Sequence, residues 1–130
     1  MKVKLWKTIF VLSWFFALGA VLSSGCSPQK ADKPQFPIGR FESVTDKYKV
    51  YIFSEGNQWK YEYYGEIGAE GKYKIKDNLW IEQGTSGECP FPGTYEWVYK
   101  DDKLTFKLVG MDQCDPRREA TDGQTFVLVR

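Results

Sequence analysis

A strict alternation of apolar and polar side chains recurs along residues 38–130 and constrains the fold more than any other feature. In one run Trp59, Tyr61 and Tyr63 alternate with charged residues. Successive side chains of a β-strand point to opposite faces, so a period of two predicts strands with one face in the core and one in water. We find no amphipathic helix of useful length in this part of the chain, which is therefore expected to be all-β.

Eight such runs are separated by turn-forming residues such as Asp77-Asn78. They predict strands over residues 39–44, 48–53, 58–64, 71–76, 79–83, 93–100, 103–109 and 124–130. Residues 110–123 lack the period and are expected to form a polar loop. A sheet of eight short strands must close or fold over to cover its apolar face. We expect an eight-stranded antiparallel up-and-down barrel, with a two-sheet sandwich as the alternative.

The alternation also predicts which rings point inward. Tyrosine and tryptophan pair an apolar body with a polar tip, so an inward cluster of them can hold a small apolar or aromatic molecule. The alternative is that the rings simply fill the barrel, because the interior of a small eight-stranded barrel is often just wide enough for its own side chains. The candidate ligand-binding residues are Trp59, Tyr61, Tyr63, Tyr73, Tyr95, Trp97 and Tyr99.

The N-terminal residues have the zones of an export signal. Three lysines within residues 1–7 precede an apolar run over residues 8–22, and Ser23-Ser24-Gly25-Cys26 follows. This ending resembles the lipobox of bacterial lipoproteins, whereas the alternative is an ordinary secretory signal. The resemblance implies a signal peptide over residues 1–25 and a lipid on Cys26 that anchors the protein to a membrane outside the cytoplasm. Ser27 implies the outer membrane in a cell that has two.

The expected domain organisation follows from these zones. Residues 26–37 contain three prolines, have no period and are expected to be a flexible tether, and residues 38–130 form the barrel domain. If Cys26 carries lipid, Cys89 and Cys114 remain as a pair in an oxidising compartment. The two lie at the ends of neighbouring expected strands, which suits a disulfide; two free thiols are the alternative.

Several short motifs resemble bacterial exported lipocalin-like domains. The motifs are Gly39-Arg40-Phe41, Gly93-Thr94-Tyr95-Glu96-Trp97, Leu104-Thr105-Phe106 and the segment from Asp112 through Cys114 to Arg117. The resemblance implies an eight-stranded barrel and an apolar ligand. It also implies a closed barrel end at Gly39, Phe41 and Arg117, where Arg117 stacks on Phe41 or a tryptophan. A salt bridge from Arg117 to Asp112 or Asp115 is the alternative.

The composition argues against catalysis and metal binding. The chain has no histidine, which removes the commonest general base and metal ligand. The spacing of Asp112, Asp115, Glu119 and Asp122 does not match a calcium-binding loop, and arginines lie among them. We therefore expect no enzyme, no catalytic residue, no metal and no cofactor.

Nucleic acid is also an unsuitable partner. After Gly25 the chain has 15 basic and 17 acidic residues, a formal charge of −2. The lysines that alternate with aromatic residues lie on the opposite strand face, so they cannot form a joint platform for bases. We expect a monomeric binding module for a small molecule. The alternative is a structural or protein-interaction domain of the cell envelope, such as an inhibitor or assembly accessory, with a filled barrel.

Overall fold

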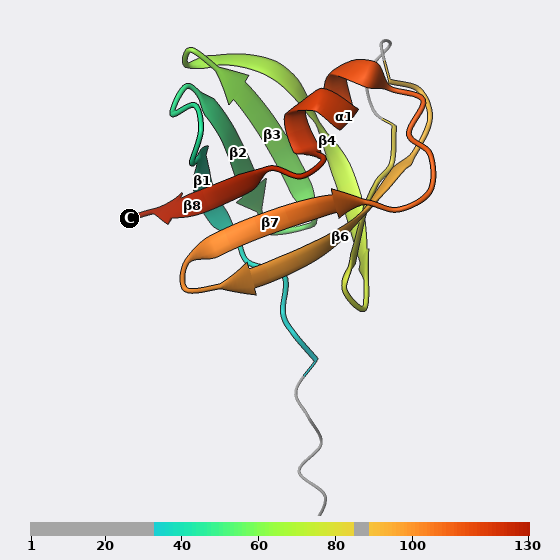
Figure 1. Ribbon diagram of the computed structural model, residues 1–130, viewed down its shortest axis with the longest axis horizontal. Helices are drawn as coiled ribbons and strands as arrows, with labels where there is room; N and C mark the ends of the chain where they lie inside the picture. The colour runs from blue at the N-terminus through green and yellow to red at the C-terminus, as the bar shows by residue number, and fades with distance from the viewer. Residues whose placement is uncertain (1–32, 85–88) are drawn as a thin grey trace, which may run out of the picture. The chain divides into compact units, whose positions relative to one another are not determined.

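The computed structural model describes residues 33–84 and 89–130 and shows a closed antiparallel barrel of eight strands with one short helix (Figure 1). The expected all-β barrel is confirmed, and the sandwich is not formed. The expected signal peptide and Cys26 lie outside the described residues. The elements are β1 (Gly39–Ser43), β2 (Lys49–Ser54), β3 (Gln58–Tyr63), β4 (Glu66–Lys76), β5 (Leu79–Glu82), β6 (Gly93–Lys100), β7 (Lys103–Leu108), α1 (Asp115–Thr121) and β8 (Thr125–Val129).

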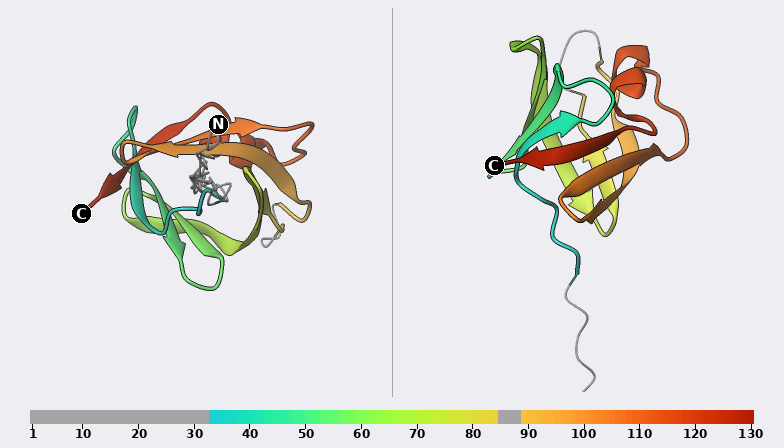
Figure 2. Two further views of the ribbon diagram at one scale, coloured as in Figure 1. Left: turned by 90° about the horizontal axis from the view of Figure 1, so that it is seen from below. Right: turned by 60° about the vertical axis from the view of Figure 1, so that its left-hand side comes forward.

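The strands follow each other around the barrel in sequence order. β8 returns to pair with β1, with Phe41 opposite Leu128 and Ser43 opposite Phe126. The left view of Figure 2 shows this closed ring of strands. Closure removes both exposed sheet edges and turns the apolar face of every strand toward one shared interior.

That interior is filled mainly by aromatic rings. Trp80 lies at its centre with no exposed surface, and its ring centroid is 5.3 Å from that of Phe106 and 5.8 Å from that of Tyr95. Trp59, Tyr73, Tyr95 and Trp97 are all buried, as the alternation predicts. Burial of these rings supplies most of the apolar area that stabilises so small a domain.

Phe36 closes the barrel end opposite α1. The segment of residues 33–38 leaves the barrel at that end (Figures 1 and 2). The ring of Phe36 packs inside the barrel, with its centroid 4.9 Å from that of Phe53 and 5.1 Å from that of Trp97. Phe36 is only 8% exposed. The packed part of the chain therefore begins before Ile38, inside the segment expected to be a tether.

β4 is longer than the alternation suggests. It begins at Glu66 rather than Gly71, and Gly68 is an extra residue opposite the step from Tyr61 to Glu62. Such a bulge bends and twists the strand, and it also hides the period of two in the sequence. The bulge lies near the β3–β4 hairpin. The Tyr63 side chain in that hairpin is 45% exposed, so the expectation that Tyr63 points into the barrel is wrong.

The helix α1 forms where a loop was expected. It spans seven residues, begins after Cys114, and carries Pro116 in its first turn together with the acidic Asp115. Both features suit a helix start, because proline lacks the N–H that a first turn leaves unpaired and an acid complements the helix dipole. Within residues 33–84 and 89–130, no helix is long and apolar enough to cross a membrane.

Candidate functional site

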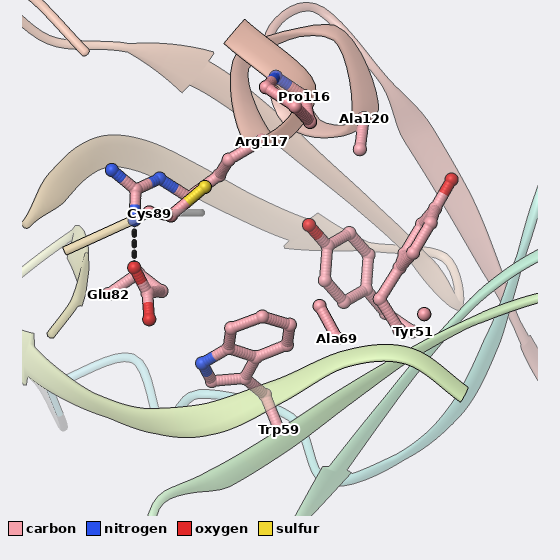
Figure 3. A pocket seen from close by; sticks show the side chains of 10 residues that line it. Tyr51, Trp59, Ala69, Glu82, Cys89, Pro116, Arg117 and Ala120 are labelled. Carbon is pink, nitrogen blue, oxygen red and sulfur yellow. Dashed lines mark hydrogen bonds and ion pairs between the residues drawn. The ribbon is translucent and has the colours of Figure 1, made fainter. Parts of the chain in front are cut away.

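A cavity of about 270 Å³ lies under α1, which contributes Arg117 and Ala120 to its lining. The helix α1 lies at the barrel end opposite the one that residues 33–38 leave (Figure 1). Figure 3 shows the side chains around it: aromatic rings from the barrel wall, an ion pair on another side, and small residues of α1 above. The lining side chains used below are Tyr51, Trp59, Tyr61, Glu82, Arg117 and Ala120. The barrel is thus packed at one end and hollow at the other, a mixture of the two alternatives drawn from the sequence.

The aromatic wall comes from neighbouring strands. Tyr51 of β2 faces Tyr61 of β3 across the sheet, and their ring centroids are 5.0 Å apart. Trp59 lies two residues before Tyr61, on the same face, with its ring centroid 6.0 Å from that of Tyr51. The Tyr51 hydroxyl is 2.6 Å from Oγ1 of Thr121, which ties the wall to α1. Three rings therefore border one small space.

A buried ion network forms the opposite wall. Arg117 is 6% exposed, and its Nε and Nη2 donate to the two carboxylate oxygens of Asp112 at 2.7 and 2.6 Å. Nη1 pairs with Glu82, and Nη2 also donates to the Phe91 carbonyl at 2.8 Å. All three guanidinium nitrogens therefore have acceptors, as a buried arginine requires.

Asp112 is held in place by several donors besides Arg117. The Tyr95 hydroxyl donates to one carboxylate oxygen, and the backbone N–H of Cys114 donates to the other at 2.9 Å. Burial alone raises the pKa of the Asp112 carboxyl, but the hydrogen bonds from Arg117, Tyr95 and Cys114 outweigh it and leave the pKa below its ordinary value. Asp112 is therefore a charged acceptor at neutral pH.

Gly93 makes room for this network. A Cβ at Gly93 would lie 2.6 Å from Nε of Arg117 and 2.6 Å from Oδ2 of Asp112, closer than atoms pack. Glycine is thus required on β6 because the ion pair lies directly against the backbone.

The disulfide between Cys89 and Cys114 is confirmed, with the two Cα atoms 5.3 Å apart. Cys114 directly precedes α1, and Cys89 lies at the cavity wall. The bond therefore fixes the start of the helix to the loop between β5 and β6, beside the ion network.

The buried tyrosines are held neutral. Burial is the main cause that raises the pKa of Tyr61 to about 12, with Asp46 and Tyr63 adding to it. Burial likewise raises the pKa of Tyr51 and Tyr95 well above the ordinary tyrosine value. These phenols act as hydrogen-bonding groups and not as charges at neutral pH.

Of the seven residues predicted to bind a ligand, only Trp59 and Tyr61 line the cavity. Tyr73, Tyr95 and Trp97 are buried in the packed interior. Their strand faces were assigned correctly, but alternation does not say how far along the barrel axis a ring lies.

The remaining two lie elsewhere. Tyr99 is half-buried, and its hydroxyl donates a hydrogen bond to Asp102 at 3.0 Å. Tyr63 packs against the exposed Tyr64, with the two ring centroids 4.6 Å apart. Neither lies at the cavity.

The three residues expected at a barrel end are not brought together. Phe41 is fully buried against Phe53 and Tyr99, whereas Arg117 pairs with Asp112 and Glu82. The salt-bridge alternative to stacking therefore describes Arg117. Gly39 has a φ of +143°, and a Cβ there would lie 2.7 Å from the Leu128 side chain, so glycine is needed at that position.

Sequence reasoning missed Tyr51, Glu82 and Ala120 as cavity residues. Glu82 shares the inward face of β5 with Trp80. A carboxylate that points into a barrel needs a positively charged partner there, because an unpaired buried charge is costly. That signal was available. Ala120 could not be found without α1, which the sequence analysis took for a loop.

Three buried donors have no partner within the described part of the chain: the indole Nε1 atoms of Trp59, Trp80 and Trp97. Trp59 is the one of the three that also lines the cavity. Among residues 33–84 and 89–130, no group of three or more cysteine, aspartate or glutamate side chains is placed to hold a metal. The arrangement offers a shaped aromatic space with a charged wall, which is suited to holding a small molecule.

No protein-family model matches this sequence, and no curated protein is similar to it at a significant level.

Proposed function

We propose that the protein is a lipid-anchored, extracytoplasmic, non-catalytic binding protein that holds a small apolar or aromatic molecule in the barrel. The observation that carries the proposal is the cavity of about 270 Å³ between the aromatic wall and α1. Tyr51, Trp59 and Tyr61 supply apolar area with few rotatable bonds, which keeps the entropic cost of binding low.

The size of the cavity limits the ligand. An engineered apolar cavity of about 150 Å³ holds one benzene molecule. The present cavity, at about 270 Å³, suits a molecule of one or two rings and is too small for a long acyl chain. Phe36 occupies the opposite barrel end, so a ligand enters beside α1.

Native mass spectrometry of the protein against a panel of small aromatic compounds tests this function. Ala120→Leu fills the cavity from α1 and is expected to abolish binding, while Glu119→Leu, at the neighbouring exposed position, leaves it unchanged. Binding that survives Ala120→Leu, or a panel without any bound compound, argues against the proposal.

The lipid anchor is tested separately. Cys26→Ala is expected to stop labelling with a palmitate analogue and to leave the precursor uncleaved. In a cell with two membranes, fractionation is expected to find the labelled wild-type protein in the outer membrane. Labelling that persists in Cys26→Ala would contradict the anchor.

A second function is favoured by an exposed aromatic cluster. The rings of Tyr48 and Tyr64 stack at 4.3 Å, Tyr63 packs on Tyr64, and Ile67 is exposed on the same hairpin. Exposed tyrosines of this kind suit a protein partner in the envelope. A photo-crosslinking residue at position 64 would then trap a partner that the same residue at Glu55, in the β2–β3 turn, does not.

A further inference from the structure

We propose that the aromatic ring held under α1 is a side chain of a protein partner, which docks on the end of the barrel around the cavity. This inference rests on the proposed binding function and names the class of molecule to which the ring belongs. Two features carry it. The cavity has an exposed mouth, and most of the exposed apolar side chains of the described chain lie at the same end of the barrel.

The mouth of the cavity lies between the start of β4 and α1. The lining residues Gly68 of β4 and Pro116 of α1 are exposed, whereas Tyr51 and Trp59 are buried deeper in the barrel. Gly68 and Ala120 carry little side chain, which leaves room between β4 and α1. A cavity of about 150 Å³ holds one benzene molecule, so one of about 270 Å³ can take the ring of a phenylalanine or tryptophan.

Exposed apolar side chains gather at this end of the barrel. Because the strands follow each other in sequence order, the β1–β2, β3–β4 and β5–β6 connections share one end with α1 (Figure 1). Of the eleven large apolar side chains that are exposed in the described residues, eight lie at this end, and the other three are Ile38, Val98 and Val129. A concentration of this kind marks an interaction site.

These side chains flank the mouth on two sides. Ile67 is 54% exposed and directly precedes Gly68. Phe91 is 55% exposed, and its carbonyl accepts a hydrogen bond from Arg117 of α1. A free molecule of one or two rings fits inside the cavity and leaves both side chains in water. A polypeptide whose ring enters the cavity also covers them, and aromatic residues are enriched at the centres of protein interfaces.

Tyr64 is a separate indication of an external contact. Its φ is +53°, in the left-handed region where bulky residues are rare, and Gly65 follows with a φ of +81°. The other four non-glycine residues with positive φ in the described chain are asparagine or aspartate, which such turns favour. The Tyr64 side chain is 63% exposed, so it does not serve the core. Residues held in an unfavourable conformation cluster at binding sites.

Other occupants fit less well. Residues 26–32 contain no aromatic residue, so the expected tether cannot supply the ring. A second copy would bring the exposed Glu119 and Asp122 close to their counterparts, and like charges repel. Residues 33–38 leave the barrel at the opposite end (Figure 1), so a lipid on Cys26 would hold that end, and not α1, toward the membrane. A different protein is the occupant that remains.

Peptide selection tests the inference with a defined probe. The full lipidated protein in nanodiscs would be used to select binders from a phage library of random peptides. We expect the selected peptides to share an aromatic residue and to bind roughly tenfold more tightly than N-acetyltryptophanamide, which supplies the ring alone. Replacement of that aromatic residue by alanine in the peptide should abolish binding.

Three variants separate the cavity from the exposed side chains around it. Ala120→Leu fills the cavity and should abolish binding of both the peptides and N-acetyltryptophanamide. Tyr64→Asn suits the left-handed turn and should leave the protein folded, with peptide affinity reduced roughly tenfold and N-acetyltryptophanamide affinity unchanged. Val98→Thr is the control, because Val98 on β6 is 63% exposed, like Tyr64, and should change neither affinity.

The outcomes distinguish this inference from the binding function on which it rests. Peptides that bind no more tightly than N-acetyltryptophanamide would overturn the protein partner and leave the binding function intact. Selected peptides without an aromatic residue, or peptides that bind Ala120→Leu as well as the wild type, would also overturn it. Dimers in native mass spectrometry that Tyr64→Asn abolishes would show that the partner is a second copy, against the inference. Failure of the peptides and of the aromatic panel together would contradict both proposals.

Discussion

Arg117 is the residue on which the architecture of the cavity most depends. It is buried with two carboxylates, and its neighbours supply an acceptor for each guanidinium nitrogen. A buried ion pair adds little net stability compared with an apolar substitute of the same shape, but the loss of one partner is costly because the other charges remain buried. The network therefore fixes α1 in one position more than it stabilises the barrel.

Arg117→Met leaves Asp112 and Glu82 buried without their cation. We expect the free energy of unfolding at pH 7 to fall by about 3–5 kcal/mol, as measured by urea denaturation. Arg117→Lys, which keeps the charge but loses the two-pronged contact with Asp112, should lose less. Equal stability of Arg117→Met and the wild type would show that the ion network does not form.

The difference in stability between the two proteins should depend on pH. In the wild type the pKa of Asp112 lies below its ordinary value of 3.8, so its contribution to stability is present above that value and is lost as the pH falls further. In Arg117→Met the guanidinium no longer lowers the Asp112 pKa, so this pKa rises and the buried carboxyl becomes protonated at a higher pH than in the wild type. The loss in unfolding free energy relative to the wild type should therefore be smaller in mild acid. Unfolding midpoints measured at pH 7 and pH 5 test this, and a constant difference would contradict it.

Gly93→Ala tests the close packing of the network on β6. The added methyl group would overlap both Arg117 and Asp112, so we expect a loss on the order of 3 kcal/mol in unfolding free energy. Gly68→Ala is the control, because the nearest atom to a Cβ there is 3.9 Å away. If both variants are equally stable, Gly93 is not packed as described.

At the level of elements, the strands were predictable and the helix was not. Period-two alternation located all eight strands because most of them bury one face more deeply than the other, as β6 does. α1 has only seven residues, too few to display a helical period, and its start at Asp115-Pro116 was taken for part of a polar loop. The cavity under α1 was hidden for the same reason, although Trp59 and Tyr61 were identified.

The disulfide belongs to this scale because it joins two elements. It closes a loop with a sequence separation of 25 residues. The double variant Cys89→Ser, Cys114→Ser should therefore unfold about 2–4 kcal/mol more easily. Intact-mass measurement of the oxidised wild type should show a mass lower by two hydrogen atoms than that of its reduced form. Two thiols that react freely with an alkylating agent before reduction would refute the bond.

In the molecule as a whole, one barrel end is sealed by the chain's own Phe36 and the other is left hollow under α1. Phe36→Ala should cost about 3 kcal/mol, because it leaves a void among Phe53, Tyr73 and Trp97. Phe91→Ala, at a ring that is 55% exposed, should cost little. Equal effects of the two substitutions would indicate that Phe36 does not enter the barrel. No period marks Phe36 in the sequence, so this plug could not be predicted.

The distinction between a packed and a hollow end is tested most directly by mapping where a small molecule binds. We would titrate the ¹⁵N-labelled protein with phenol and follow amide and indole chemical shifts by NMR. Perturbations are expected at Trp59, Tyr61 and Ala120, which border the cavity, with Trp97 near the Phe36 end unaffected. Shifts confined to Trp97, or to the exposed rings around Tyr64, or no shifts at all, would contradict a ligand site under α1.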